Sequence, residues 1–279
     1  MMAMLEFVQY LNKSKLFPHV NNPFSFFDRA SRFLPFAEKT ESVVRLGAAS
    51  APDFGSTIKV ISWNMFKARK KGCMPDLTSM SAGVELVLLQ EAVLHGGVAQ
   101  PFHLASGLEW IMAENIGVGG GITTGPKTGS RVASLSSRCV KSLDREPLVS
   151  TPKTFVITSY PFAGKTLLVL NVHAINLVST AKFARQIEQI IGPIHDHQGP
   201  CIVAGDFNTW NESRWHLLQK AMSELGLARV PAAAPQWRHF NQVLDHVFYR
   251  DLKLVNSRAL VGVRSSDHVP LWAEFGALT

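Results

Sequence analysis

The 279-residue chain has few cysteines and no long apolar run, and each shortage excludes a class of protein. Its three cysteines, Cys73, Cys139 and Cys201, are odd in number and far apart, so they predict neither a disulfide framework nor a zinc site. No apolar run approaches the ~20 residues that a membrane-spanning helix needs. The start of the chain carries Glu6 within an apolar patch and has no early Lys or Arg, which argues against a secretory signal peptide. We therefore expect a cytoplasmic protein, with export by another route left open.

Acidic residues are the minority charge. The chain has 28 Lys and Arg against 21 Asp and Glu, a formal net charge of +7. This excess favours association with a polyanion, either nucleic acid or an acidic phospholipid membrane surface, but a basic surface that only aids solubility fits the charge equally well. With 46% hydrophobic residues, the chain can bury the core of one large α/β domain, which we expect to be a monomer.

The sequence changes character near residue 55. Residues 1–55 are rich in Phe and Pro, with apolar residues at helical spacing between 26 and 34, and predict an accessory segment of short helices. Residues 56–279 predict the main domain, in which short β-branched runs alternate with amphipathic helices at 179–197 and 211–225. The runs that predict strands are 58–64, 84–90, 131–137, 154–162, 166–174, 201–207, 244–250, 257–262 and 270–275.

A glycine-rich region at 114–130 predicts a mobile loop. It is not a Walker A loop, because it lacks the Gly-Lys-Ser/Thr ending and opens no helix. The chain shows no internal repeat. Nine or more strands with helices between them predict two packed sheets flanked by helices.

Polar residues that phosphate chemistry could use recur where the apolar runs end. Loops at strand ends are where a rigid scaffold presents catalytic groups. Each residue alone has an ordinary explanation, such as a turn, a solvated strand end or a hydrogen-bonded core histidine, but their recurrence along one chain is hard to attribute to chance. They are Asn64, Gln90, Glu91, Asn171, His173, Asp206, Asn208, Asp245, His246, Asp267 and His268.

The segments "SWN", "LLQE", "NVHAIN", "GDFN", "LDHVF" and "SDH", in this order, resemble the endonuclease/exonuclease/phosphatase superfamily, which has the deoxyribonuclease-I-like fold. The resemblance spans about residues 57–276, and "GDFN" with "SDH" is its most specific part. The texts "REP" at 145–147 and "LDHVFYR" are similar to those of a poorly characterised bacterial branch. The resemblance implies a four-layered α/β sandwich, with two packed mixed or antiparallel sheets flanked by helices and an active site where the loops of both sheets meet.

The resemblance implies a metal site at three of these positions. Glu91 matches the metal-binding glutamate of the family, Asn64 matches the asparagine that accompanies it, and Asp267 matches the acid of the final motif. Carboxylate and amide oxygens without thiolates suit a hard divalent cation. We therefore expect Mg²⁺ or Mn²⁺ as the cofactor.

The resemblance also implies a phosphate side of the site. Asp206 matches the aspartate that orients or deprotonates the attacking water, and Asn208 matches a residue that holds the phosphate or the water. His268 matches a histidine that contacts the scissile phosphate, with Asp245 as the acid that orients its imidazole. Such an arrangement can stabilise the charge that develops when water attacks a phosphodiester.

Two further matches are His173, where nuclease members place a second active-site histidine or a tyrosine, and Asn176, which falls on a phosphate-side asparagine. The sequence indicates no carboxylate partner for His173. Met65 and Phe66 follow Asn64 where abasic-site endonucleases carry an acid two residues on, which disfavours an abasic-site repair role. His246 replaces a hallmark arginine of inositol-polyphosphate phosphatases, which lowers the phosphoinositide alternative.

The leading hypothesis is a metal-dependent phosphodiester hydrolase, an endo- or exonuclease, whose basic run Lys67, Arg69, Lys70 and Lys71 contacts nucleic acid phosphates. The first alternative is a lipid phosphoesterase of the sphingomyelinase or phosphoinositide phosphatase type, with residues 1–55 as an interfacial anchor. The second alternative is a non-catalytic binding module with the same fold. It is disfavoured because all six motif sites are filled.

Overall fold

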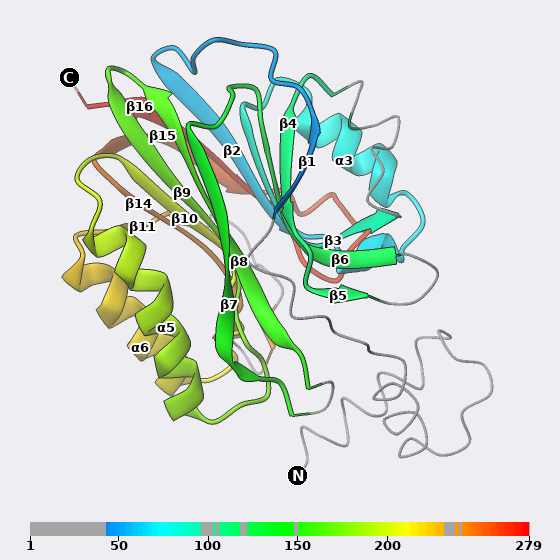
Figure 1. Ribbon diagram of the computed structural model, residues 1–279, viewed down its shortest axis with the longest axis vertical. Coiled ribbons are helices and arrows are strands. Elements are labelled where there is room, and N and C mark those ends of the chain that lie inside the picture. The colour runs from blue at the N-terminus through cyan, green and yellow to red at the C-terminus, as the bar shows by residue number, and fades with distance from the viewer. Residues whose placement is uncertain are drawn as a thin grey trace.

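The computed structural model describes residues 43–95, 103, 106–117, 122–147, 150–231, 238–239 and 242–278. Two β-sheets pack face to face, with helices on their outer sides (Figure 1). None of the helices within these ranges is long and apolar enough to cross a membrane. The short helices predicted between 26 and 34 lie outside the described residues.

The first sheet has eight strands in the order β1-β4-β6-β3-β2-β16-β15, with β5 paired to β6. Strands β2 and β3 are parallel and the other pairs are antiparallel, so the sheet is mixed. Its strands are β1 (Val43–Gly47), β2 (Thr57–Asn64), β3 (Leu86–His95), β4 (Glu109–Ala113), β5 (Ile116–Gly117), β6 (Ile122–Ser130), β15 (Leu252–Ala259) and β16 (Leu271–Ala277).

The second sheet has six strands in the order β11-β14-β10-β9-β8-β7 and is also mixed, because β9 and β10 run parallel. Strands β12 (Arg238–His239) and β13 (Gln242–Val243) form a separate pair. The strands of the second sheet are β7 (Ser136–Arg145), β8 (Pro152–Phe162), β9 (Lys165–His173), β10 (Cys201–Asp206), β11 (Ala228–Arg229) and β14 (Asp245–Arg250). The predicted two-sheet α/β sandwich is confirmed.

Each sheet buries its outer face under helices. Helix α3 (Cys73–Ser81) covers the first sheet, and α5 (Thr180–His195) and α6 (Glu212–Glu224) cover the second (Figure 1). Side-chain oxygens cap α5 and α6: Ser179 accepts from the backbone of Lys182 and Asn211 from that of Arg214. The apolar stripe that predicted the helix at 179–197 is buried in α5, so both predicted helices are confirmed.

The glycine-rich region is largely a strand, so the loop prediction for 114–130 is wrong over Ile122–Ser130. The reason is packing against β4. A Cβ at Gly129 would lie 2.6 Å from the ring of Trp110, so this position admits no side chain. Glycine here allows close contact between two buried strands rather than mobility.

The strand predicted at 131–137 is also wrong, because β6 ends at Ser130 and β7 begins at Ser136. Ser130 Oγ donates to the carbonyl of Val132 and accepts from its backbone N–H, which forms a local turn in place of strand pairing.

Strand β1 lies within the segment predicted as accessory, yet it pairs with β4 at the edge of the first sheet. The domain boundary at residue 55 stays a prediction.

Candidate active site

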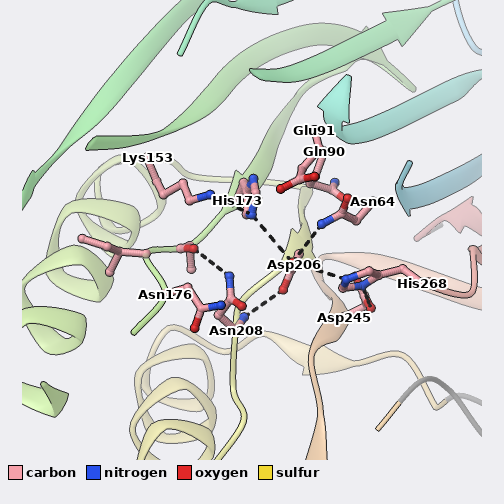
Figure 2. A network of polar contacts seen from close by, with 12 residues as sticks. Asn64, Gln90, Glu91, Lys153, His173, Asn176, Asp206, Asn208, Asp245 and His268 are labelled. Carbon is pink, nitrogen blue, oxygen red and sulfur yellow. Dashed lines mark hydrogen bonds and ion pairs between the residues drawn. The ribbon is translucent and has the colours of Figure 1, made fainter. Parts of the chain in front are cut away.

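Strand register brings the polar strand ends to one edge of the sandwich. In the first sheet Asn64 of β2 pairs with Gln90 of β3, and in the second His173 of β9 pairs with Asp206 of β10. Antiparallel β14 places Asp245 opposite Asp206. Because the paired strands β2–β3 and β9–β10 are parallel, their carboxyl ends lie at the same edge of each sheet. The two sheets then place these side chains in one cluster (Figure 2).

Asp206 is the centre of this cluster. Its Oδ2 accepts from Asn64 Nδ2 at 3.0 Å, and its Oδ1 accepts from the backbone N–H of Asn208 at 2.9 Å (Figure 2). The preceding Gly205 has φ of +146°, and a Cβ there would collide with the carbonyl of Val172. The sequence "GDFN" therefore needs glycine so that β10 can lie against β9 while Asp206 points between the sheets.

His268 faces Asp206 with a second carboxylate behind it. Its Nδ1 lies 2.7 Å from Asp245 Oδ2, and its Nε2 lies 3.9 Å from Asp206 Oδ2. Burial works against the charged imidazole, but the carboxylates of Asp245, Asp206 and Asp267 raise the pKa of His268 to about 10. Burial has the opposite effect on the carboxyl group of Asp206, because it disfavours the charged form, and it raises the pKa of Asp206 to about 6. The structure thus brings together the histidine and the acids that the sequence predicted as one group.

Asn208 lies in the left-handed region, with φ of +51°, and its Nδ2 donates to the carbonyl of Ala174 at 2.8 Å. Behind this loop is Arg214 of α6, which is fully buried and which sequence reasoning missed. The guanidinium donates to the carbonyls of Asn208, Ile175 and Val178 at 2.9, 3.1 and 3.0 Å. One arginine therefore ties the loop after β10 to the loop after β9.

Arg214 is held in turn by two aromatic rings, with its guanidinium carbon 4.5 Å from the ring centroid of Phe183 and 4.9 Å from that of Trp210. Burial lowers the pKa of Arg214 to about 10. The sequence signal for this residue was slight, since an arginine in the first turn of a helix normally faces water.

Glu91 lies on a β-bulge. Between Leu89 and Ala92 the register of β3 against β6 shifts, and Glu91 adopts φ of +50°. A bulge of this kind re-aims a side chain out of the alternating pattern. The carboxylate pairs with Lys67, whose Nζ lies 2.7 Å from Oε2. Burial alone would raise the pKa of Glu91, but Lys67, His173 and Lys153 hold it well below its usual range.

The donor groups around Glu91 suit a hard divalent cation. The Glu91 carboxylate is ionised, the amide of Asn64 lies nearby on the same sheet edge, and both offer oxygen rather than sulfur. Asn64 Oδ1 accepts from the backbone of Phe66 at 3.1 Å, and Asp267 Oδ1 accepts from Ser266 Oγ at 3.3 Å. Within the described ranges no three His, Cys, Asp or Glu side chains form a ready metal cluster. The ligand set Asn64, Glu91 and Asp267 stays a prediction.

His173 has a lysine beside it. Its Nε2 lies 3.4 Å from Lys153 Nζ and 3.7 Å from Asp206 Oδ2. Burial and the charge of Lys153 hold the pKa of His173 well below its usual value. Lys153 also lies 3.5 Å from Glu146, whose Oε1 accepts from the backbone N–H of Asn176 at 2.8 Å.

Lys153 and Glu146 are functional candidates that sequence reasoning missed. Glu146 belongs to the "REP" text, which carried resemblance but no role, and Lys153 is the single charged residue of strand β8. Asn176 lies at the rim of the cluster, where its Oδ1 accepts from the backbone of Leu177 at 2.8 Å (Figure 2).

Residues 61–268 of the chain match the model of the Endonuclease/Exonuclease/phosphatase family. The chain belongs to this family. The match covers every strand-end residue of the cluster from Asn64 of β2 to His268.

Bacterial relatives extend the similarity to most of the chain. A UPF0294 protein of Yersinia pseudotuberculosis is 33% identical over 227 residues, covering 78% of this chain and 83% of its own length. A UPF0294 protein of Erwinia tasmaniensis is 31% identical over 250 residues, covering 86% and 90%. The predicted resemblance to a bacterial branch of the family is confirmed.

Solved structures share the fold at low identity. An endonuclease/exonuclease/phosphatase from Beutenbergia cavernae aligns with a TM-score of 0.63 and 19% identity, covering 80% of this chain and 72% of that chain. D. rerio TDP2 complexed with single strand DNA product aligns with a TM-score of 0.56 and 15% identity, covering 80% and 100%. These likenesses support the deoxyribonuclease-I-like sandwich.

Proposed function

We propose that the protein is a divalent-metal-dependent phosphodiester hydrolase and that its substrate is nucleic acid. The observation that supports this most is the buried face-to-face arrangement of Asp206 and His268, with Asp245 2.7 Å behind the imidazole. The Asp206 carboxylate is suited to accept a proton, and the His268 imidazole is suited to donate a hydrogen bond. Family membership supports a phosphoric ester hydrolase. The alternative of a non-catalytic module is disfavoured because none of these groups is missing.

The chain's own residues supply most of the chemistry. Asp206, with a pKa raised by burial to about 6, acts as the base toward water, while Asn64 and Asn208 fix the orientation of its carboxylate. His268 donates a hydrogen bond to the phosphate, and Asp245 keeps its imidazole protonated and aimed. A Mg²⁺ or Mn²⁺ held by Glu91 and Asn64, with Asp267 beside His268, would offset the charge that develops on the phosphate oxygens.

Charge and a structural relative support nucleic acid as the partner. The net charge of +7 favours a polyanion, and D. rerio TDP2 has been solved with a single strand DNA product. The basic run divides into two parts. Lys67 pairs with Glu91 and Lys70 Nζ donates to the carbonyl of Ser266 at 2.7 Å, so these two hold the site loops, whereas the side chain of Lys71 is exposed. We propose that Lys71 and Arg69, which is also exposed, contact the phosphate backbone.

The test is hydrolysis of supercoiled plasmid, single-stranded DNA and RNA with Mg²⁺ or Mn²⁺, and with EDTA as the blank. Wild-type protein should cleave at least one of them, and Asp206→Asn should reduce the rate by at least ~100-fold. Asp196→Asn, which changes an exposed acid at the end of α5, is the matched control and should cleave like wild type. Equal cleavage by wild type and Asp206→Asn would refute the assignment.

Vesicles of sphingomyelin and of phosphoinositides form a further arm of the same panel. Release of phosphocholine or inorganic phosphate from vesicles, without cleavage of any nucleic acid, would replace the nuclease proposal with the lipid phosphoesterase alternative.

A further inference from the structure

Lys153 is a buried cation inside the cluster whose contacts are long. Its side chain lies on β8, and within the described part of the chain its Nζ reaches only Glu146 at 3.5 Å and His173 at 3.4 Å. Only 8% of Lys153 is exposed, so water solvates its ammonium group little. A buried ammonium costs several kcal/mol unless close partners compensate it. Two contacts near the outer limit of hydrogen bonding leave this group incompletely compensated.

The surroundings nevertheless keep Lys153 charged. Burial opposes the ammonium form, but Glu146, Glu91 and Asp206 together raise its pKa. The charge therefore results from the acids of the site, in the same way that Asp245 keeps His268 protonated. Figure 2 shows Lys153 and His268 on opposite sides of Asp206.

The neighbouring histidine is less suited to contact an anion. The pKa of His173 lies well below its usual value because of burial and Lys153, so the ring is neutral. If Nε2 accepts from Lys153, the ring proton lies on Nδ1, away from both Lys153 and Asp206. Lysine carries three N–H donors, and Glu146 and His173 use two of them. One donor is left for a substrate.

We propose that Lys153 is a second phosphate-binding residue, whose ammonium group contacts a non-bridging phosphate oxygen on the side of Asp206 opposite to His268; this inference rests on the proposed function. Glu146 then positions Lys153 as Asp245 positions His268. The two cation–carboxylate pairs would hold one phosphate between them. His173, which the sequence predicted as a catalytic residue, becomes a positioning residue for Lys153.

The test measures binding of inorganic phosphate by calorimetry at neutral pH in EDTA. Lys153→Met should bind phosphate at least ~10-fold more weakly than wild type, because it loses a charged hydrogen bond. Lys153→Arg should keep most of the wild-type affinity. Lys253→Met, which removes an exposed lysine of β15, should bind like wild type. Unchanged affinity in Lys153→Met, or no phosphate binding by wild type, would overturn the inference.

A second measurement, by NMR, follows Lys153 in the wild-type protein and does not depend on Lys153→Met. In wild-type protein with ¹³Cε-labelled lysine, phosphate should shift the Lys153 resonance, identified by its absence in Lys153→Arg, and leave that of Lys253 in place. A Lys153 signal that phosphate does not shift overturns the inference even if Lys153→Met fails to fold.

The two proposals fail separately. If Lys153→Met loses phosphate binding but wild type hydrolyses no phosphodiester, the anion site stands and the proposed function falls. If wild type cleaves DNA and Lys153→Met keeps its phosphate affinity, the function stands and the role of Lys153 falls.

Discussion

The His268–Asp245 pair should make the stability of the protein depend on pH. Both side chains are buried, and Nδ1 lies 2.7 Å from Oδ2. Burial favours the neutral imidazole, yet Asp245 and the other nearby acids raise the pKa of His268 from 6.5 to about 10. At about 1.36 kcal/mol per pKa unit, this difference corresponds to ~5 kcal/mol in favour of the folded, protonated state.

Because folding raises this pKa, the stabilisation is complete below about pH 6.5, the unfolded value, and is lost as the pH rises through about 10. Replacing Asp245 by Asn removes the carboxylate that holds the proton on the buried imidazole, so that burial favours the neutral ring. We expect the free energy of unfolding to fall by ~3 to 5 kcal/mol at pH 7, and by much less at pH 10.5, where the wild-type imidazole is also neutral.

Urea denaturation at pH 7, 8.5 and 10.5 in EDTA measures this difference, and NMR of the imidazole protons gives the pKa of His268 directly. The matched control is Asp196→Asn, because Asp196 pairs with His195 at 3.2 Å but both side chains are exposed, so its loss should change stability little at any pH. A difference between wild type and Asp245→Asn that stays constant from pH 7 to 10.5 would refute the reasoning, as would a wild-type His268 that titrates near 6.5.

Three other substitutions test the metal site and its support. Lys67→Met should bind Mg²⁺ about fivefold more tightly by calorimetry, because the ion no longer displaces an ammonium 2.7 Å from Glu91; unchanged affinity would count against Glu91 as a ligand. Gly205→Ala should lower the free energy of unfolding by more than ~3 kcal/mol, because its Cβ would meet a backbone carbonyl. Gly226→Ala, with φ of +72° and only an ordinary contact at 3.7 Å with the Arg250 side chain, should cost ~1 kcal/mol; similar losses would contradict the collision. Arg214→Met should cost ~3 kcal/mol in urea denaturation, because three backbone carbonyls lose their donor, and a loss below ~1 kcal/mol would mean that water replaces the guanidinium.

The sequence predicted those parts of the structure that follow from local pattern. Apolar alternation and helical periodicity predicted most strands and both helices of the second sheet, since these patterns arise from burial on one face. The glycine-rich strand β6 was missed because glycine favours turns locally, and only the ring of Trp110 shows why Gly129 is needed in a strand. Tertiary packing overrode propensity there.

The candidate site divides in the same way. The acids and histidines of "GDFN", "LDHVF" and "SDH" were predicted as one group, because the order of these motifs resembles that of a family in which they form one site. Lys153 and Arg214 were missed, because their surroundings come from several segments of the chain. The pKa of Lys153 depends on Glu146 after β7, Glu91 of β3 and Asp206 of β10, and Arg214 donates to carbonyls of two loops. A lone Lys or Arg in a sequence carries no sign of burial.

Asn208 allows backbone strain and chemistry to be separated. Its φ of +51° costs a residue with a Cβ ~1 kcal/mol relative to glycine, and its Nδ2 donates to the carbonyl of Ala174. Asn208→Gly and Asn208→Ala both remove the amide, but only the glycine variant relieves the strain. We therefore expect hydrolysis to fall by a similar factor in both, on the order of 100-fold, while Asn208→Ala unfolds at a free energy ~1 kcal/mol below Asn208→Gly. If Asn208→Gly alone kept its activity, the position would serve only to bend the backbone and the amide would have no part in the reaction.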